Sequence, residues 1–274
     1  MCTYEQWAER AEQAARAAGV ILRRMQPTIT AREKAPKDLV SEADWESQRA
    51  IRQLLAAHYP DYGFLGEESP GGKQQKLPPG YVWIVDPLDG TSNYVHGVPS
   101  YAVSIALWCD HQPLVGVVLD PVLDECFVAI RGHGARLNGR PIAPSRCRAL
   151  RDALVAASLG PQVPRGSVEV ARLVEAIHEA QGVRRTGSAA LNLCYVACGR
   201  FDGYWATSVS LWDVAAGLLL VEEAGGCVTN LHGGAFRYWQ PEVLVSASQE
   251  LHTQLLEMLR RAEGTLSPSG PAVS

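Results

Sequence analysis

A strongly apolar segment, YVWIV at 81–85, runs directly into two carboxylates, Asp86 and Asp89. Burying carboxylates at the end of a core strand is costly unless a positive species meets them. The two aspartates flank a Pro-Leu pair, so their side chains and the Leu88 carbonyl can point into one space. Oxygen ligands of this kind suit Mg²⁺. The segment therefore predicts a magnesium site.

An anion site is predicted directly after these carboxylates. Thr91 follows Gly90, where a short helix can begin. Free backbone N–H groups at the start of a helix bind anions. Carboxylates for a cation beside amides for an anion form the layout of a metal-assisted phosphate site.

Other acidic residues also lie at the ends of predicted elements. Glu67 and Glu68 follow a short strand, Asp44 opens a helix, and Asp213 lies in the first turn of an apolar helix. Taken alone, the two glutamates are typical of a solvated turn. Asp213 taken alone is typical of an acidic residue at a helix N-terminus, where the helix dipole favours a negative charge. Taken together with the two aspartates above, they predict a single acidic site.

The elements that must position these residues alternate along the chain. A capping box from Thr3 to Gln6, followed by apolar residues at helical spacing, predicts a helix over 4–25. Residues 26–40 are expected to form a short hairpin or a mobile loop, and 42–58 a second helix. A short strand that ends before Glu67 is expected within 63–69. Strands are then expected at 81–85, 100–108, 113–121 and 125–131, the last three as a meander, before a turn and short strand pair within 132–145.

The second half reads as strands separated by helices. Strands are expected at 153–159, 183–186, 203–207, 227–230 and 242–248, and helices at 167–182, 188–199, 211–226 and 249–263. This order favours an α+β part over 1–148 and an α/β part over 149–264, with a boundary near 146–152. Residues 265–274 are rich in Ser, Pro and Gly and are expected to be a disordered tail.

Composition excludes several classes of protein. With 274 residues, 47% hydrophobic and 20% charged, the chain is an ordinary globular protein with ample core. Its net charge of −4 does not suggest a nucleic-acid footprint, so no nucleic-acid partner is expected. The charged N-terminus has no apolar signal region, and no apolar run reaches the roughly 18 residues of a membrane helix. We therefore expect a cytoplasmic protein with no membrane partner.

Seven cysteines are present without a C-x-x-C motif. Cys194 and Cys198 lie four apart on a predicted helix, where small core residues are a better interpretation than metal ligands, because no His or Cys partner lies at zinc spacing. Unpaired thiols fit a reducing compartment.

Several segments closely resemble one known family. They are DLVSEAD at 38–44, GEES at 66–69, WIVDPLDGTSNYVHG at 83–97, RTGSAALNLCYVACGRFDGY at 185–204 and WDVAAGLLLVEEAGG at 212–226. These segments are similar to the inositol monophosphatase family of Mg²⁺-dependent, lithium-sensitive phosphatases, and the resemblance runs from about residue 4 to 260. It implies a layered αβαβα sandwich of the sugar phosphatase type, a small phosphomonoester substrate and, as is usual among relatives, a homodimer.

The resemblance implies a ligand set for the metal ions. Glu67, Asp86 and the Leu88 carbonyl would hold one Mg²⁺, and Asp86, Asp89 and Asp213 would hold a second. Glu67 would also serve catalysis by touching a third, weaker ion through water, and Asp89 would also face the substrate. Lithium is expected to inhibit by replacing the second Mg²⁺.

The resemblance also implies roles in catalysis and substrate binding. Thr91, with Asp44 behind it, would orient and deprotonate a metal-activated water. The Gly90 and Thr91 amides would bind the phosphate. Ser188 and Ala189 match the family's leaving-group wall.

One position departs from the family pattern. Members that prefer inositol phosphates carry a Glu seven residues before the Asp of the WD motif, and here that substrate-binding position is Ala206. A methyl group cannot accept a hydrogen bond from a substrate hydroxyl, so discrimination by that contact is lost. The nearest polar candidates are Thr207 and Ser208.

The sequence therefore leaves several substrates as alternatives. Inositol monophosphate or a broad range of small sugar or polyol phosphates ranks first, followed by fructose 1,6-bisphosphate and then a nucleotide 3′-phosphate. Because one bacterial relative also binds transcription machinery, a regulatory binding module is an alternative of another class.

Three basic side chains have uncertain roles. Lys34 and Lys37 lie where relatives have a mobile segment near the site, and they either steer phosphate or are solvated loop lysines. His96 is expected to pack or lie on the surface, without a catalytic role.

Overall fold

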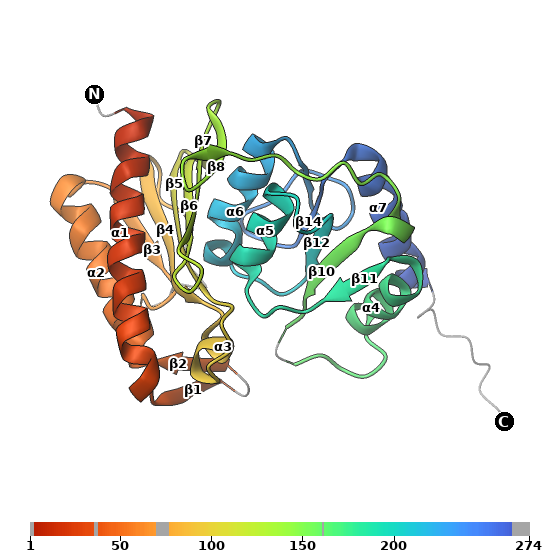
Figure 1. The fold of residues 1–274 in the computed structure, drawn as a ribbon, viewed down its shortest axis with the longest axis horizontal. Coiled ribbons are helices and arrows are strands. Elements are labelled where there is room, and N and C mark those ends of the chain that lie inside the picture. Colours follow the sequence, from red (N-terminus) through yellow and green to blue (C-terminus); the bar gives the residue numbers. More distant parts are fainter. Residues whose placement is uncertain (1–2, 36–37, 70–76, 161, 265–274) are drawn as a thin grey trace.

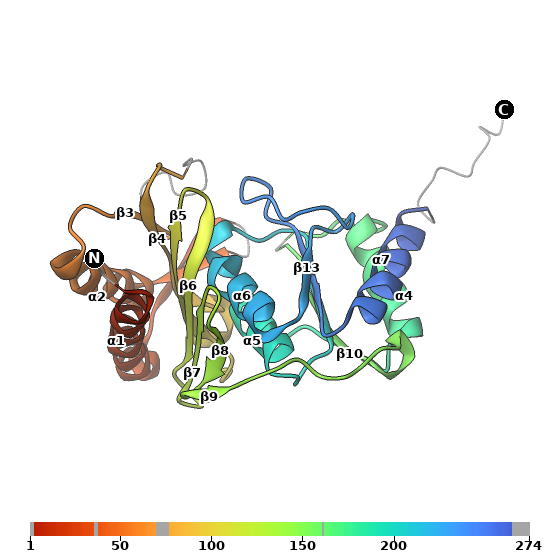
Figure 2. The same cartoon turned by 90° about the horizontal axis from the view of Figure 1, so that it is seen from above.

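The computed structural model describes residues 3–35, 38–69, 77–160 and 162–264. Five layers follow one another across the molecule, alternating helices and sheets (Figure 1). The view from above shows the same succession, with α1 and α2 at one end and α4 and α7 at the other (Figure 2). The predicted αβαβα sandwich is confirmed.

The predicted helices are all present, with ends shifted by a few residues. They are α1 Tyr4–Met25, α2 Glu42–His58, α3 Thr91–Val95, α4 Val168–Glu179, α5 Ala189–Ala197, α6 Leu211–Ala224 and α7 Gln249–Gly264, with 3-10 turns at Gln26–Thr28 and Leu150–Asp152. The capping box predicted at Thr3 and Gln6 is formed.

The strands form three sheets. The hairpin alternative for 26–40 is confirmed, because β1 Ala31–Ala35 pairs antiparallel with β2 Asp38–Ser41. A seven-stranded sheet runs in chain order through β3 Gly63–Gly66, β4 Tyr81–Asp89, β5 Ala102–Cys109, β6 Gln112–Asp120, β7 Glu125–Ile130, β8 Gly134–Leu137 and β9 Arg140–Pro141. A five-stranded sheet has the order β11 Gly182–Arg184, β10 Leu154–Ser158, β12 Gly203–Ala206, β14 Val243–Ser246 and β13 Cys227–Thr229.

Helices α1 and α2 cover the outer face of the seven-stranded sheet. Along α1, the buried side chains on this face are mostly alanines, including Ala11, Ala14 and Ala18, with Trp7 and Leu22 near the two ends. Small side chains allow the helix to lie close to the sheet, and the apolar stripe has the helical period that the sequence predicted. These residues share one hydrophobic cluster with strands β4 to β7.

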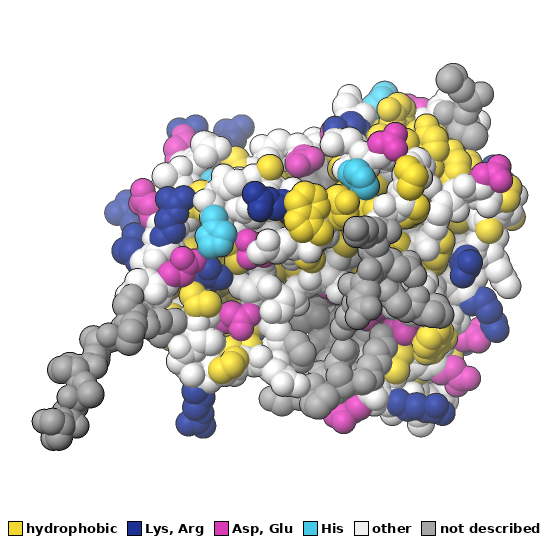
Figure 3. Space-filling view, turned by 180° about the vertical axis from the view of Figure 1, so that it is seen from behind, with side chains coloured by type: hydrophobic (Ala, Val, Ile, Leu, Met, Phe, Trp, Pro, Cys, Tyr) yellow, Lys and Arg dark blue, Asp and Glu magenta, His cyan; other side chains and the backbone are white. Residues whose placement is uncertain are grey.

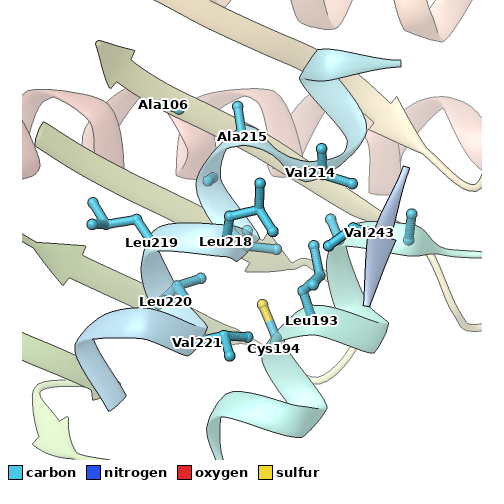
Figure 4. Packing of buried hydrophobic residues seen from close by; sticks show 14 of the residues in the cluster. Ala106, Leu193, Cys194, Val214, Ala215, Leu218, Leu219, Leu220, Val221 and Val243 are labelled. Carbon is cyan, nitrogen blue, oxygen red and sulfur yellow. The ribbon is translucent and has the colours of Figure 1, made fainter. Parts of the chain in front are cut away.

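Helices α5 and α6 fill the space between the two sheets and are apolar on nearly all sides, as expected for helices buried from both faces. Figure 4 shows Leu218 and Val221 of α6 beside Leu193 and Cys194 of α5. A Cβ on Gly116 of β6 would lie 2.6 Å from the Ala216 carbonyl oxygen, so glycine permits the close approach of α6 to the sheet.

This middle core joins residues from both predicted parts of the chain. The division into 1–148 and 149–264 therefore remains a prediction about chain organisation, since α6 packs directly on the first sheet. The interpretation of the two helical cysteines as core residues is confirmed: Cys194 is fully buried, and Cys198 is partly buried against the same cluster.

Strand β4 corrects the prediction that the strand ends at residue 85. It continues through Asp86 to Asp89, with a register shift against β5 between these two aspartates. Such a bulge leaves a residue without a ladder partner, which is where a strand can accommodate Pro87. The two aspartates therefore belong to the strand, and the bulge sets the direction of their side chains.

Other sequence expectations concern the surface and the thiols. No helix in the described part of the chain is long and apolar enough to cross a membrane. The cysteines within the described residues are all unpaired. On the face seen in Figure 3, the described Lys and Arg side chains are interspersed with Asp and Glu. The predicted tail at 265–274 lies outside the described residues.

Candidate active site

A cavity of about 550 Å³ lies where the end of β4 meets the starts of α3, α5 and α6. Among its lining residues are six of the predicted site residues: Glu67, Asp89, Gly90, Thr91, Ala189 and Asp213. They come from loops and element ends far apart in the sequence. The fold thus brings together the acidic residues and the glycine turn that the sequence singled out.

Carboxyl groups crowd one wall of this cavity. Asp86 and Asp89 are buried. Burial, followed by repulsion from Glu67 and the other two aspartates, raises the pKa of Asp86 well above its usual range. Burial and the charges of Asp89 and Glu67 likewise raise the pKa of Asp213, against a hydrogen bond from the Ser210 N–H at 2.7 Å and one with Asp86. A bound cation would keep these carboxyl groups ionised.

The start of α5 holds Asp89 in place. Ser188 Oγ donates to Asp89 Oδ2, and the N–H groups of Ala190 and Ala189 donate at 2.8 and 3.3 Å. Burial nevertheless outweighs these bonds and raises the pKa of Asp89 to about 6. Ser188 is fully buried behind this carboxylate, whereas Ala189 lines the cavity.

The donor set fits a magnesium ion. No three of the His, Cys, Asp and Glu side chains that the structure describes are spaced as a finished metal cage. Mg²⁺ does not require one, because it keeps several waters and binds through one or two carboxylates together with substrate phosphate. Asp86, Asp89, Asp213 and Glu67 supply hard oxygen ligands, and their mutual repulsion is relieved by a cation.

Thr91 and Asp44 form a hydrogen-bonded pair beside the acidic wall. Thr91 Oγ1 lies 3.1 Å from both Asp44 Oδ1 and the Leu88 carbonyl oxygen. Asp44 is fully buried, and its Oδ2 accepts from Ser41 N–H at 2.8 Å and Ser41 Oγ at 2.6 Å, which is the capping box of α2. The hydroxyl of Thr91 is therefore oriented by an ionisable partner that is itself fixed.

Gly90 begins the short helix α3, as the sequence predicted. Its φ is +92°, and a Cβ there would lie 3.0 Å from the Ser100 carbonyl oxygen and 3.4 Å from that of Gly187. Only glycine fits this position, because the backbone is left-handed and packed against another chain segment. Gly90 and Thr91 both line the cavity, and Gly90 has no side chain to cover its backbone there.

Other singled-out residues lie away from the cavity wall. Ala206 is fully buried at the end of β12, where it pairs with Val243, although Ser208 lines the cavity. His96 is exposed, as expected. Glu68 is buried rather than solvated, and its N–H donates to Gln48 Oε1 at 2.9 Å.

Whether Lys34 and Lys37 steer phosphate stays a prediction. Lys34 belongs to β1, but its side chain is not among the described parts, and Lys37 lies outside the described residues.

The sequence reasoning missed some of the cavity lining. Ser158 ends β10, Leu159 and Gly160 follow it, and Arg185 follows β11. The available signal was positional, because β10 and β11 are parallel, and ligand sites lie beyond the carboxyl ends of such strands. Asn93 was also missed: its Nδ2 donates to the carbonyls of Ser100 and Thr186 at 2.6 and 2.7 Å, tying α3 to the segment before α5.

The profile of the inositol monophosphatase family matches residues 3–263. The chain belongs to the inositol monophosphatase family. Within it, an inositol-1-monophosphatase of Rhizobium meliloti is 43% identical over 232 residues, covering 83% of this chain and 85% of that protein. A Nus factor SuhB of Xylella fastidiosa is 43% identical over 224 residues, covering 80% of each chain.

A solved structure of the family has the same fold. The extragenic suppressor protein suhB from Bartonella henselae superposes with a TM-score of 0.86 at 37% identity, covering 92% of this chain and 98% of that chain. The resemblance predicted from the sequence is confirmed. The inositol monophosphatase family comprises metal-dependent phosphatases, which agrees with an acidic cavity beside a glycine turn.

Proposed function

We propose that this protein is a Mg²⁺-dependent phosphomonoesterase that hydrolyses inositol monophosphate or a related small polyol phosphate. The observation that carries the proposal is one cavity lined by Glu67, Asp89, Asp213 and Thr91, with the hydroxyl of Thr91 hydrogen-bonded to the buried Asp44. Family membership and the inositol-1-monophosphatase of Rhizobium meliloti support the same reaction class.

The residues that would hold Mg²⁺ are Glu67, Asp86, the Leu88 carbonyl, Asp89 and Asp213. Bound there, the ions would neutralise phosphate charge and lower the pKa of a water molecule. Two such ions are proposed, with a third, weaker one reached by Glu67 through water. Neutralising the phosphate dianion is the main requirement of monoester hydrolysis, so no covalent nucleophile is needed.

The protein's own groups would orient the substrate and move the proton. The Gly90 and Thr91 amides would hold the phosphate. Thr91 Oγ1 would accept a hydrogen bond from the attacking water while donating its own proton toward Asp44 Oδ1, 3.1 Å away. The two Ser41 donors bind the other oxygen of Asp44 and so hold the carboxylate in place, with Oδ1 toward the Thr91 hydroxyl. Water thus loses a proton along a path of two fixed oxygens.

The test is phosphate release from a panel of phosphomonoesters with Mg²⁺, scored as kcat/KM. The panel contains inositol 1-phosphate, fructose 1,6-bisphosphate and a nucleotide 3′-phosphate, which separates the candidate substrates. Asp89→Asn should abolish release from all of them. Unchanged release by Asp89→Asn would remove the metal assignment.

A regulatory role is the second candidate, because relatives of comparable identity are named Nus factor SuhB. It predicts association with transcription machinery. Co-purification with RNA polymerase, combined with no phosphate release from any panel member, would favour this role over catalysis.

We further expect a homodimer in the cytoplasm, with no membrane or nucleic-acid partner. The unpaired described cysteines agree with a reducing compartment. Light scattering of the purified protein tests the oligomeric state.

A further inference from the structure

The side of the cavity formed by the ends of β10 and β12 lacks the carboxylate that the family pattern places at residue 206. Ala206 pairs with Ser158 across these strands, and its side chain is fully buried. Directly after it, Thr207 and Ser208 leave the strand, and Ser208 lines the cavity. This wall therefore has hydroxyls at its surface where a charged acceptor is expected.

A carboxylate from another element reaches the same wall. Glu169, on helix α4, accepts hydrogen bonds at Oε1 from Thr207 Oγ1 and, at 3.3 Å, from Ser208 Oγ. Thr207 lies 38 residues further along the chain, so the contact is made by the packing of α4 beside the five-stranded sheet. Ser208 lines the cavity and Glu169 does not, so the Glu169 carboxylate is joined to the cavity lining through the Ser208 hydroxyl.

The second oxygen of this carboxylate has spare accepting capacity. Both hydroxyls bond to Oε1, and within the described residues no hydrogen bond or ion pair involves Oε2. A carboxylate has about four lone-pair sites. Glu169 is also half-buried and lies in the first turn of α4, where the helix dipole favours a negative charge. The group is thus able to accept further hydrogen bonds.

We propose that Glu169 supplies, from α4, the hydroxyl-accepting carboxylate that Ala206 lacks. Thr207 and Ser208 hold it at the leaving-group wall, and it accepts hydrogen bonds from hydroxyls of a polyol leaving group. The assignment rests on the proposed phosphatase function. It makes Glu169 a determinant of substrate preference that favours polyol monophosphates and repels a second phosphate at the same wall.

The experiment compares Glu169→Gln with wild type on two substrates. Inositol 1-phosphate offers hydroxyls to the wall, whereas p-nitrophenyl phosphate offers none. Because the hydrogen bonds lost are to a charged group, kcat/KM for inositol 1-phosphate should fall about 10-fold or more. It should change less than about twofold for p-nitrophenyl phosphate, and kcat/KM for fructose 1,6-bisphosphate should rise.

Glu175→Gln is the matched control, because Glu175 lies on the same helix and, within the described residues, makes no hydrogen bond to Thr207 or Ser208. It should leave both substrates unchanged. Equal losses of Glu169→Gln on both substrates, or no loss on either, would overturn the proposal, since a purely structural role of Glu169 does not distinguish leaving groups.

Failure of the phosphatase function itself has a different signature. In that case wild type releases no phosphate from any panel member. The Glu169 assignment is then judged by calorimetric titration of inositol 1-phosphate in the presence of Ca²⁺. Binding at least about 10-fold weaker for Glu169→Gln than for Glu175→Gln sustains it, whereas equal or absent binding overturns it.

Discussion

Thr91 and Asp44, 47 residues apart in the sequence, lie side by side with 3.1 Å between Oγ1 and Oδ1. The contact joins the start of α2 to the turn after β4. Asp44 is placed by the capping box with Ser41, and Thr91 by the glycine turn that begins α3. Two ordinary helix starts thus combine to form the group proposed to accept a proton from water.

Replacing Thr91 by Val tests this pair. The variant keeps the shape of the side chain but removes the hydroxyl, so kcat should fall by about 10²- to 10⁴-fold, as for loss of a general base, with a smaller change in KM. Thr91→Ser retains the hydroxyl and should keep most of the activity. Steady-state kinetics on inositol 1-phosphate measure both, and full activity of Thr91→Val would contradict the proton path.

Replacing Asp213 by Asn separates metal binding from folding. Burial and neighbouring charges raise the pKa of Asp213, so the amide relieves repulsion in the metal-free protein while still accepting from Ser210 N–H. Without Mg²⁺ the variant should melt roughly 2–4 °C higher than wild type, equivalent to about 1 kcal/mol. Addition of Mg²⁺ should raise the melting temperature and the activity of wild type, and it should raise neither in Asp213→Asn.

Differential scanning calorimetry with and without EDTA measures these shifts. Asp61→Asn, at an exposed aspartate, is the control and should behave as wild type. A metal-free Asp213→Asn that melts below wild type would show that the carboxylate is already neutralised within the protein.

Removal of metal should abolish activity reversibly. Dialysis against EDTA should stop phosphate release and Mg²⁺ should restore it, because the crowded carboxyls require a cation to stay ionised. Lithium should inhibit the Mg²⁺-restored enzyme, as the family resemblance implies. Insensitivity up to tens of millimolar would place the chain in a lithium-resistant branch.

Adding a carboxylate at residue 206 should depend on Glu169. If both positions serve the same substrate hydroxyls, Ala206→Glu should raise kcat/KM for inositol 1-phosphate more in the Glu169→Gln background than in wild type. The four proteins form a double-mutant cycle, and independent sites would give additive changes. Because Ala206 is fully buried, the melting temperature of each variant must be followed as well.

Acid stability should report on His252. This residue is buried, with Ser246 Oγ and Thr229 Oγ1 each 2.9 Å from one ring nitrogen, and burial lowers its pKa from 6.5 to about 4. The unfolded chain therefore binds the proton first as pH falls. The stabilisation is complete above pH 6.5 and is lost as pH falls toward 4, by about 1.4 kcal/mol per pH unit.

Urea unfolding at pH 7.5 and 5.0 measures this effect. The difference between wild type and His252→Gln isolates it from the acidic cluster, whose raised pKa values act in the opposite direction. Wild type should lose about 2 kcal/mol relative to the variant between these two values. Parallel pH profiles would show that folding does not lower the pKa of His252.

The sequence by itself determined the features that depend on neighbours within a few residues. The capping box at Thr3, the alanine stripe of α1 and the glycine turn at Gly90 follow from local periodicity and backbone preference. The apolar segment before Asp86 and Asp89 is also a local feature, because the aspartates directly follow it in the sequence. For this reason the helices and the acidic site were predictable, together with the family.

Only the tertiary structure decided the contacts between distant segments. The bulge in β4 required the register of β5, and the bonds from Ser188 to Asp89 and from Thr207 to Glu169 span 99 and 38 residues. Such contacts depend on how α4, α5 and the two sheets pack, which no local pattern encodes. The reaction class was therefore readable from one short segment, whereas the wall proposed to select the substrate exists only once α4 lies beside β12.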